Sequence, residues 1–169
     1  MAEVKRIPML TREEEDELAR RYRDHGDVEA AHRLVTANLR FVVKIAYQFR
    51  AYGLRMLDLI QEGNLGLMRA VQKFNPDRGY RLVSYAVWWI KAFLQAYVLK
   101  NHSLVKLGTT QAQRKLFFRL RGARARLEQE VETSGEELTH EERQARLAAE
   151  LGVEDTDISE MELRMAARD

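Results

Sequence analysis

The stretch DLIQEGNLGLMRAVQKFNPDRGYRLVSYAVWWIKA, residues 58–92, decides how this chain folds. Two apolar-periodic segments flank Asn-Pro-Asp-Arg-Gly at 75–79, a sequence typical of a tight turn. The spacing predicts one helix from about Met56 to Phe74 and, after the turn, a second helix that carries both tryptophans of the chain. Two helices joined by one turn are therefore the centre from which the other segments can be assigned.

The rest of the chain is also helical by pattern, since 169 residues contain only two prolines and nine glycines. Capping-box pairs, Thr11 with Glu14 and Thr139 with Glu142, predict two helix starts. We expect an all-α protein. Its other helices are predicted before Gly26, as one long helix from Asp27 to about residue 50, from about Thr110 to Val131, and as a last pair separated at Gly152.

The helix before the turn has two faces. Its predicted core stripe is Leu57, Ile60, Leu67, Val71 and Phe74. A second face holds Asp58, Gln61, Glu62, Leu65 and Met68. Polar groups mixed with an exposed Leu and Met suggest a protein-docking patch. The alternative, a slightly apolar solvent face, stays open.

The tryptophan helix also has two faces. Val87, Ile90, Leu94 and Val98 form an aliphatic stripe, while Tyr85, Trp88 and Trp89 lie on the other side with Lys91 and Gln95 on its flank. Aromatic rings beside cations suit single-stranded nucleic acid, because each base stacks on a ring for roughly 1–3 kcal/mol. A helix buried on both faces is the alternative that the pattern leaves open.

The charge distribution favours a polyanionic partner. Residues 75–126 contain eleven Lys and Arg and one acid, a net charge of +10, whereas residues 127–169 contain four and fourteen, a net charge of −10. Lys and Arg gain affinity by displacing counterions from phosphates. An uneven but merely solvated surface is the alternative.

Other classes of protein fit less well. The chain has no cysteine, and its four histidines are scattered, so we expect no enzyme, no metal and no cofactor. Neither a signal peptide nor a membrane segment is predicted, which favours a cytoplasmic protein.

The stretch at 58–92 closely resembles the central conserved domain of the main family of bacterial sigma factors, the promoter-specificity subunits of RNA polymerase. QRKLFFRLR at 113–121 is similar to the box of the heat-shock branch, and so is MLTREEEDELARRYRDHGDVEAAHRLVTANLRFVVKIA at 9–46. The resemblance implies a sigma-type bundle over residues 1–104, followed by a small three-helix domain over residues 105–169.

The resemblance implies two partners, the RNA polymerase core and promoter DNA. The helix before the turn would dock on the clamp coiled coil of the largest polymerase subunit through Asp58, Gln61, Glu62, Asn64, Leu65 and Met68. The tryptophan helix would capture the non-template strand of the melted minus-ten element. The DNA-binding set is Phe74, Arg78, Tyr80, Arg81, Ser84, Tyr85, Trp88, Trp89, Lys91, Gln95 and Lys100.

Within that set, Tyr85, Trp88 and Trp89 would hold a flipped adenine in a pocket lined by Phe74 and Ser84. Lys91, Ala92 and Gln95 match readers of the duplex base pair just upstream. Arg78, Arg81, Lys100 and Lys106 are candidates for phosphate contacts by charge and position. Leu82 and Ala92 depart from the housekeeping pattern, so we expect a different minus-ten preference.

The family's C-terminal helix-turn-helix has no counterpart in the sequence, which we therefore expect to be a truncated fragment. RLAAELGVEDTDISEMELRM at 146–165 fits helix-turn-helix spacing, but its second helix is acidic and would repel phosphate, which favours a structural module. The heat-shock branch also implies control by chaperones or a regulatory protease through residues 37–49. A stand-alone helical protein that binds single-stranded nucleic acid is the alternative function.

Overall fold

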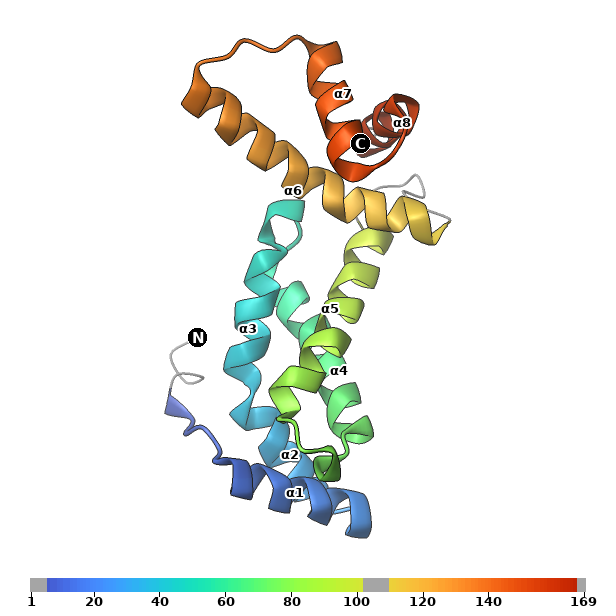
Figure 1. The fold of residues 1–169 in the computed structure, drawn as a ribbon. Helices are drawn as coiled ribbons and strands as arrows, with labels where there is room; N and C mark the ends of the chain where they lie inside the picture. Colours follow the sequence, from blue (N-terminus) through green and yellow to red (C-terminus); the bar gives the residue numbers. More distant parts are fainter. Residues whose placement is uncertain (1–5, 102–109, 167–169) are drawn as a thin grey trace. The chain divides into compact units, whose positions relative to one another are not determined.

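The structure, a computed structural model, describes residues 6–101 and 110–166. Within these residues the chain forms eight α-helices and no strand, which confirms the all-α prediction (Figure 1). The chain divides into two compact units, Met1–Val98 and Leu99–Asp169. The predicted boundary between residues 104 and 105 lies outside the described residues.

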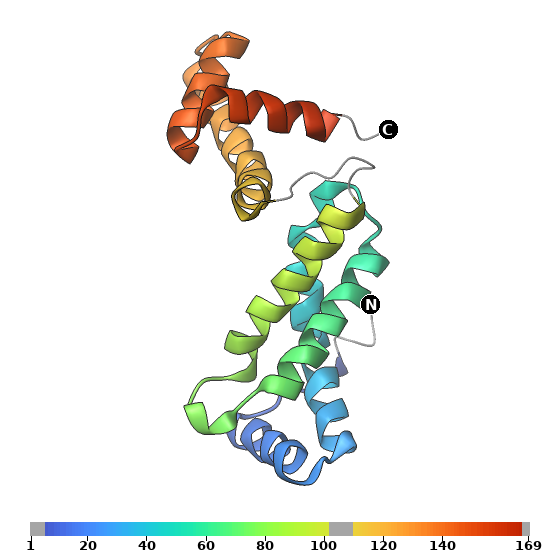
Figure 2. The ribbon, with the colours of Figure 1, turned by 90° about the vertical axis from the view of Figure 1, so that its right-hand side faces the viewer.

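Unit 1 is built from five helices. They are α1 (Arg12–His25), α2 (Val28–Ala37), α3 (Leu39–Gln48), α4 (Met56–Lys73) and α5 (Leu82–Asn101), of which α5 ends beyond the unit's last residue. Two 3-10 turns, η2 (Arg50–Tyr52) and η3 (Pro76–Arg78), lie between them. Helices α3, α4 and α5 lie side by side, and α1 crosses this bundle near the η3 turn (Figures 1 and 2).

The first helix begins and ends as its caps predict. Thr11 and Glu14 form both bonds of the capping box, with the Glu14 amide donating to Thr11 Oγ at 3.2 Å. Gly26, at a φ of 65°, ends the helix in the left-handed conformation.

The single long helix predicted from Asp27 is wrong, because Asn38 divides it into α2 and α3. Asn38 has φ −108° and ψ 6°, and its side-chain amide donates to the Leu34 carbonyl at 2.7 Å. An asparagine side chain competes with the backbone for such carbonyls and so favours a helix end.

The core face of α4 differs from the predicted stripe. Leu57 is 72% exposed and Ile60 is half-buried, whereas Leu59 is fully buried. The buried residues of α4 are Leu59, Gly63, Gly66, Leu67, Ala70 and Val71. Leu67, Val71 and Phe74 of the predicted stripe are buried as expected, whereas apolar spacing missed Leu59 and the two glycines of this face.

The surroundings of Gly66 explain why this face includes glycines. A Cβ at this position would lie 2.8 Å from the Ile90 Cα and 2.9 Å from the Trp89 carbonyl oxygen. The backbones of α4 and α5 thus approach each other too closely for any side chain. Gly63 is similar, since a Cβ there would lie 2.7 Å from Val42 Cγ1 of α3.

Helix α5 fills the core with Leu82, Ala86, Ile90, Leu94 and Val98, while Val87 is half-buried. It is also the one described helix that is long and apolar enough, by length and composition, to cross a membrane. A core helix meets the same two criteria, and the buried stripe of α5 is that of a core helix.

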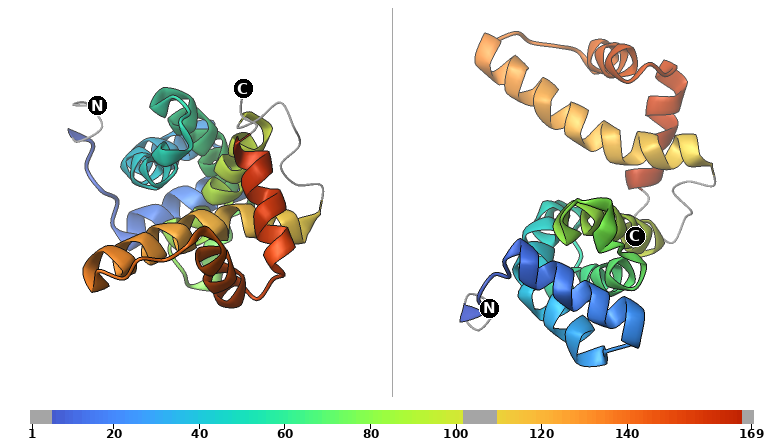
Figure 3. Two further views of the ribbon diagram at one scale, coloured as in Figure 1. Left: turned by 90° about the horizontal axis from the view of Figure 1, so that it is seen from above. Right: turned by 60° about the horizontal axis from the view of Figure 1, so that its bottom comes forward.

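Unit 2 contains α6 (Gln111–Ser134), α7 (His140–Leu151) and α8 (Asp155–Ala166), and α7 and α8 both pack against α6 (Figure 3). The predicted capping box of Thr139 and Glu142 is present. The buried face of α6 consists of Leu116, Phe117, Leu120, Ala123 and Leu127.

Candidate nucleic-acid interface

Four aromatic rings meet where α4 ends and α5 begins. Phe74 follows α4, Tyr80 follows η3, and Tyr85 and Trp89 lie one turn apart on α5. The Phe74 ring centroid lies 6.0 Å from that of Tyr80 and 6.2 Å from that of Tyr85. Tyr85 in turn lies 6.1 Å from Tyr80 and 6.5 Å from Trp89. We call these four residues the aromatic cluster.

The cluster has a buried base and an open rim. Phe74 is 5% exposed and Tyr80 is 37% exposed. Tyr85 and Trp89 are half-buried. Ring pairs at such distances hold each other in place, and the partial exposure of Tyr80, Tyr85 and Trp89 leaves these three rings accessible.

Trp88 stands apart from the cluster, because consecutive residues of a helix lie about 100° apart around its axis. Its side chain is 74% exposed, and Ser84 and Ala92 of the same helix are exposed as well. The aromatic side of α5 is therefore accessible, contrary to the alternative in which this helix is buried on both faces.

The predicted polar contacts to DNA outside the aromatic cluster have different environments. Arg78 and Lys100 are exposed, whereas Lys91 and Gln95 are half-buried. Lys106 lies outside the described residues.

Arg81 is bound by a carboxylate that the sequence analysis did not single out. Its Nε and Nη2 donate to Glu15 Oε1 and Oε2 at 3.1 and 3.2 Å, and Nη2 also donates to the Leu10 carbonyl. The Glu15 hydrogen bond is the main cause of a raised pKa for Arg81.

Glu15 itself is 1% exposed and is the one polar or charged residue buried in the described part of the chain. Its Oε1 also accepts the Leu82 backbone N–H at 2.8 Å, at the first residue of α5. The signal for this burial was weak, because Glu15 is one of five consecutive acids, distinguished only by helical spacing to Leu18 and Ala19.

Further contacts connect α1 to the turn before α5. Arg23 Nη1 lies 2.5 Å from Asp77 Oδ2, and Arg20 Nη2 lies 3.4 Å from the other oxygen of the same carboxylate. Arg12 donates to the Gly79 carbonyl. The hydrogen bond from Arg23 is the main reason that the pKa of Asp77 lies below its usual range.

The outer face of α4 combines polar and apolar groups. Leu65 and Met68 are 48% and 47% exposed, and Leu57, predicted to be core, joins them on this face. Asp58 is paired with Arg55 at 2.8 Å, and Gln61 is exposed. Glu62 and Asn64 are half-buried, and Asn64 Oδ1 is a buried atom without a hydrogen-bond partner among the described residues.

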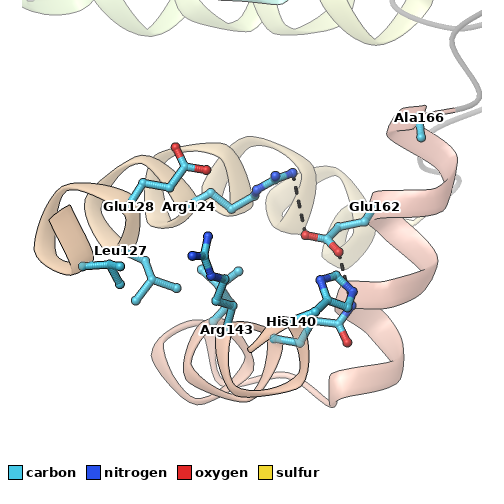
Figure 4. A pocket seen from close by; sticks show the side chains of 10 residues that line it. Arg124, Leu127, Glu128, His140, Arg143, Glu162 and Ala166 are labelled. Atoms are coloured by element: carbon cyan, nitrogen blue, oxygen red, sulfur yellow. Dashed lines mark hydrogen bonds and ion pairs between the residues drawn. The ribbon is translucent and has the colours of Figure 1, made fainter. Parts of the chain in front are cut away.

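Unit 2 has a recess of about 310 Å³ between α6, α7 and α8, shown in Figure 4. Glu162 is one of its lining residues. Its carboxylate accepts a hydrogen bond from the Gln144 amide at 3.2 Å and forms an ion pair with Arg124 at 3.7 Å. No group of three or more His, Asp or Glu side chains suited to a metal ion occurs in the described part of the chain. The recess contains none of the predicted site residues.

Comparison with known families identifies the same segments that carry these surfaces. The profile described as Sigma-70 region 2 matches residues 34–103, and that described as Sigma-70 factor, region 1.2 matches residues 1–27. The chain belongs to the sigma-70 family. The resemblance drawn from residues 58–92 is thereby confirmed.

Relatives of this sigma-70 chain match it over all or nearly all of its length. It is 55% identical over 169 residues to the RNA polymerase sigma-C factor of Myxococcus xanthus, covering 56% of that protein. It is 45% identical over 169 residues to RNA polymerase sigma factor RpoH of Caulobacter vibrioides, again covering 56%. RpoH of Zymomonas mobilis is 47% identical over 168 residues, with 54% covered. The sigma-70 chain thus spans about half the length of these relatives.

Proposed function

We propose that this chain is the part of a transcription initiation factor that binds the RNA polymerase core and captures the non-template strand of the minus-ten element. The observation that carries the proposal is the accessible aromatic side of α5, which carries the exposed Trp88 as well as Tyr85 and Trp89 of the aromatic cluster. Duplex DNA offers no free base faces, so such rings suit a melted strand or a flipped base.

Capture requires no bond chemistry. When thermal opening exposes a base, it stacks against Tyr85 and Trp89, while the rings of Phe74 and Tyr80 pack against Tyr85 and hold it in place. Trp88 blocks the path of the duplex on the upstream side, with Ser84 at the edge of the pocket. The sequence is then read through the free energy of the trapped base, and Lys91 and Gln95 contact the adjoining base pair.

Arg78 and Lys100 would contact the DNA phosphates, because their side chains are exposed. Arg81 is a weaker candidate, because a phosphate would have to compete with the buried carboxylate of Glu15 for its guanidinium.

The outer face of α4 is the proposed polymerase-docking surface, formed by Asp58, Gln61, Glu62, Asn64, Leu65 and Met68. Leu57 extends it, since it is exposed and lies on the same side as Met68. Its partner would be the clamp coiled coil of the largest polymerase subunit. Apolar side chains within a polar rim are typical of protein interfaces.

The factor would be of the heat-shock type and act in the cytoplasm, without a catalytic role. Relatives named RpoH and the box at 113–121 support this assignment. Residues 1–104 would form the polymerase-binding and minus-ten-binding domain, and residues 105–169 the domain that follows it. Chaperones or a protease would act on residues 37–49, which include the exposed Tyr47.

The test is fluorescence anisotropy of a labelled non-template minus-ten strand, titrated with this protein in the presence and absence of bacterial core polymerase. We expect binding that requires both proteins, prefers this strand over its complement and weakens on Trp89→Ala. Binding without polymerase and without strand preference would instead support the alternative, a general single-strand binder.

A further inference from the structure

We infer that Glu15 is a positioning residue for the base-capturing surface: from α1 it fixes the start of α5, and thereby the aromatic cluster. The inference rests on the proposed function for its consequence in DNA binding. The geometry that supports it is independent of that function.

The first step is the way α5 begins. The first amides of an α-helix have no partner within the helix and need an outside acceptor when they are buried. The Leu82 amide finds that acceptor in Glu15 Oε1, 67 residues away in sequence. A carboxylate at this end also interacts favourably with the helix dipole.

The second step is the burial of the carboxylate. Glu15 is 1% exposed, so water cannot replace Arg81 or Leu82 as its partner without the site opening. The fork of the Arg81 guanidinium matches both carboxylate oxygens, which fixes the direction as well as the distance of the contact. This geometry permits little rotation or sliding of the first turn of α5.

The third step runs from that first turn to the rings. Arg81 and Leu82 directly follow Tyr80 and lie four and three residues before Tyr85, so a shift at this point moves two members of the aromatic cluster. Trp89 lies one turn further and packs against Tyr85. Loss of the Glu15 contacts should therefore change the environment of Trp89 before any DNA is present.

The test uses the full chain and two readouts. In a Trp88→Phe background, where Trp89 is the single tryptophan, emission wavelength and acrylamide quenching report the packing of the cluster. In the native background, anisotropy with core polymerase reports affinity for the non-template strand. Glu15→Gln keeps the side-chain volume and removes the charge. Glu17→Gln, an exposed residue of the same helix, makes the same charge change as a control.

We expect Glu15→Gln to alter Trp89 emission and quenching and to weaken strand binding by about fivefold or more, with Glu17→Gln like the native protein. A folded Glu15→Gln variant with unchanged Trp89 emission and unchanged affinity would overturn the inference. If that variant does not fold, Arg81→Lys replaces it for the fluorescence readout, since lysine keeps the charge but loses the fork. Unchanged emission in that folded variant would equally overturn the inference.

The two readouts separate this inference from the proposed function. Altered Trp89 emission in a chain whose native form does not bind the strand would leave the positioning role intact and reject the sigma-type capture. Native strand binding, with Trp89 emission and strand affinity that Glu15→Gln both leaves unchanged, would reject the positioning role and leave the sigma-type capture intact.

Discussion

Trp88 and Trp89 are neighbours in sequence, yet they have different physical roles in unit 1. Trp88 is 74% exposed, whereas Trp89 is half-buried and packs edge-on against Tyr85. A substitution at Trp88 therefore removes a contact surface, and one at Trp89 also removes part of the aromatic cluster.

Trp88→Ala should weaken binding of the non-template strand with core polymerase while leaving the free energy of unfolding nearly unchanged. Trp89→Ala should weaken strand binding and also lower the free energy of unfolding. Each lost stacking contact corresponds to about 1–3 kcal/mol of binding free energy. Anisotropy and urea denaturation followed by circular dichroism measure the two effects. Equal loss of stability in both variants would contradict the assigned environments.

Asp77 should contribute to the acid sensitivity of the fold. Its pKa is lowered by Arg23, so the folded state favours the ionised form. Such a group stabilises the fold above its unfolded-state pKa, and that contribution is lost as the pH falls through its folded-state pKa, below about pH 4. Asp77→Asn should flatten the decline of unfolding free energy in that range. An identical pH dependence in both proteins would show that the contact does not stabilise the turn.

At the scale of the element, the spacing between α4 and α5 depends on Gly66. Gly66→Ala would place a methyl group 2.8 Å from the Ile90 Cα, where backbone cannot yield as a flexible side chain does. We expect a loss of about 1–3 kcal/mol in unfolding free energy, with a shift in tryptophan emission.

Gly122 of α6 supplies the matched control. A Cβ there would meet only the Arg126 guanidinium, at an ordinary 3.6 Å. Gly122→Ala should therefore stabilise its helix by up to about 1 kcal/mol. Chemical denaturation measures the change in unfolding free energy, which should be negative for Gly66→Ala and positive for Gly122→Ala. Destabilisation by Gly122→Ala, or an unchanged unfolding free energy in Gly66→Ala, would contradict these assignments.

The outer face of α4 yields a prediction about polymerase binding. Met68→Glu, and likewise Leu57→Glu, should abolish or strongly weaken binding to core polymerase without unfolding the chain, because both side chains are exposed. Leu163→Glu on α8, at 72% exposure, is the control with the same chemical change. Retained binding by a folded Met68→Glu variant in a pull-down or anisotropy assay would argue against this surface.

At the scale of the whole molecule, the two units should be separable. Unit 1 buries its own core and contains both the aromatic cluster and the outer face of α4. A chain ending after Asn101 should unfold cooperatively and retain polymerase-dependent binding of the non-template strand. Loss of cooperative unfolding, measured by circular dichroism, would mean that unit 1 depends on the rest of the chain.

The helices were largely predictable because their signals are local. Caps at Thr11, Gly26, Thr139 and Gly152 act within a few residues, and the turn at 75–79 is closed by the Asn75 side chain, which accepts from the Asp77 amide at 3.0 Å. The division at Asn38 was missed, since an asparagine inside an apolar-periodic segment ends a helix only when its side chain takes a carbonyl.

The sequence by itself therefore determined the all-α class, most helix ends and the exposure of Trp88, Leu65 and Met68, because these depend on neighbours within one or two turns. Only the tertiary structure decided which side of α4 is core, how closely α4 and α5 approach at Gly66, and that Glu15 is buried against Arg81 and Leu82. Periodicity gives the angle of a residue around its own helix. Which other element packs against that side of the helix is decided by contacts between segments far apart in the chain.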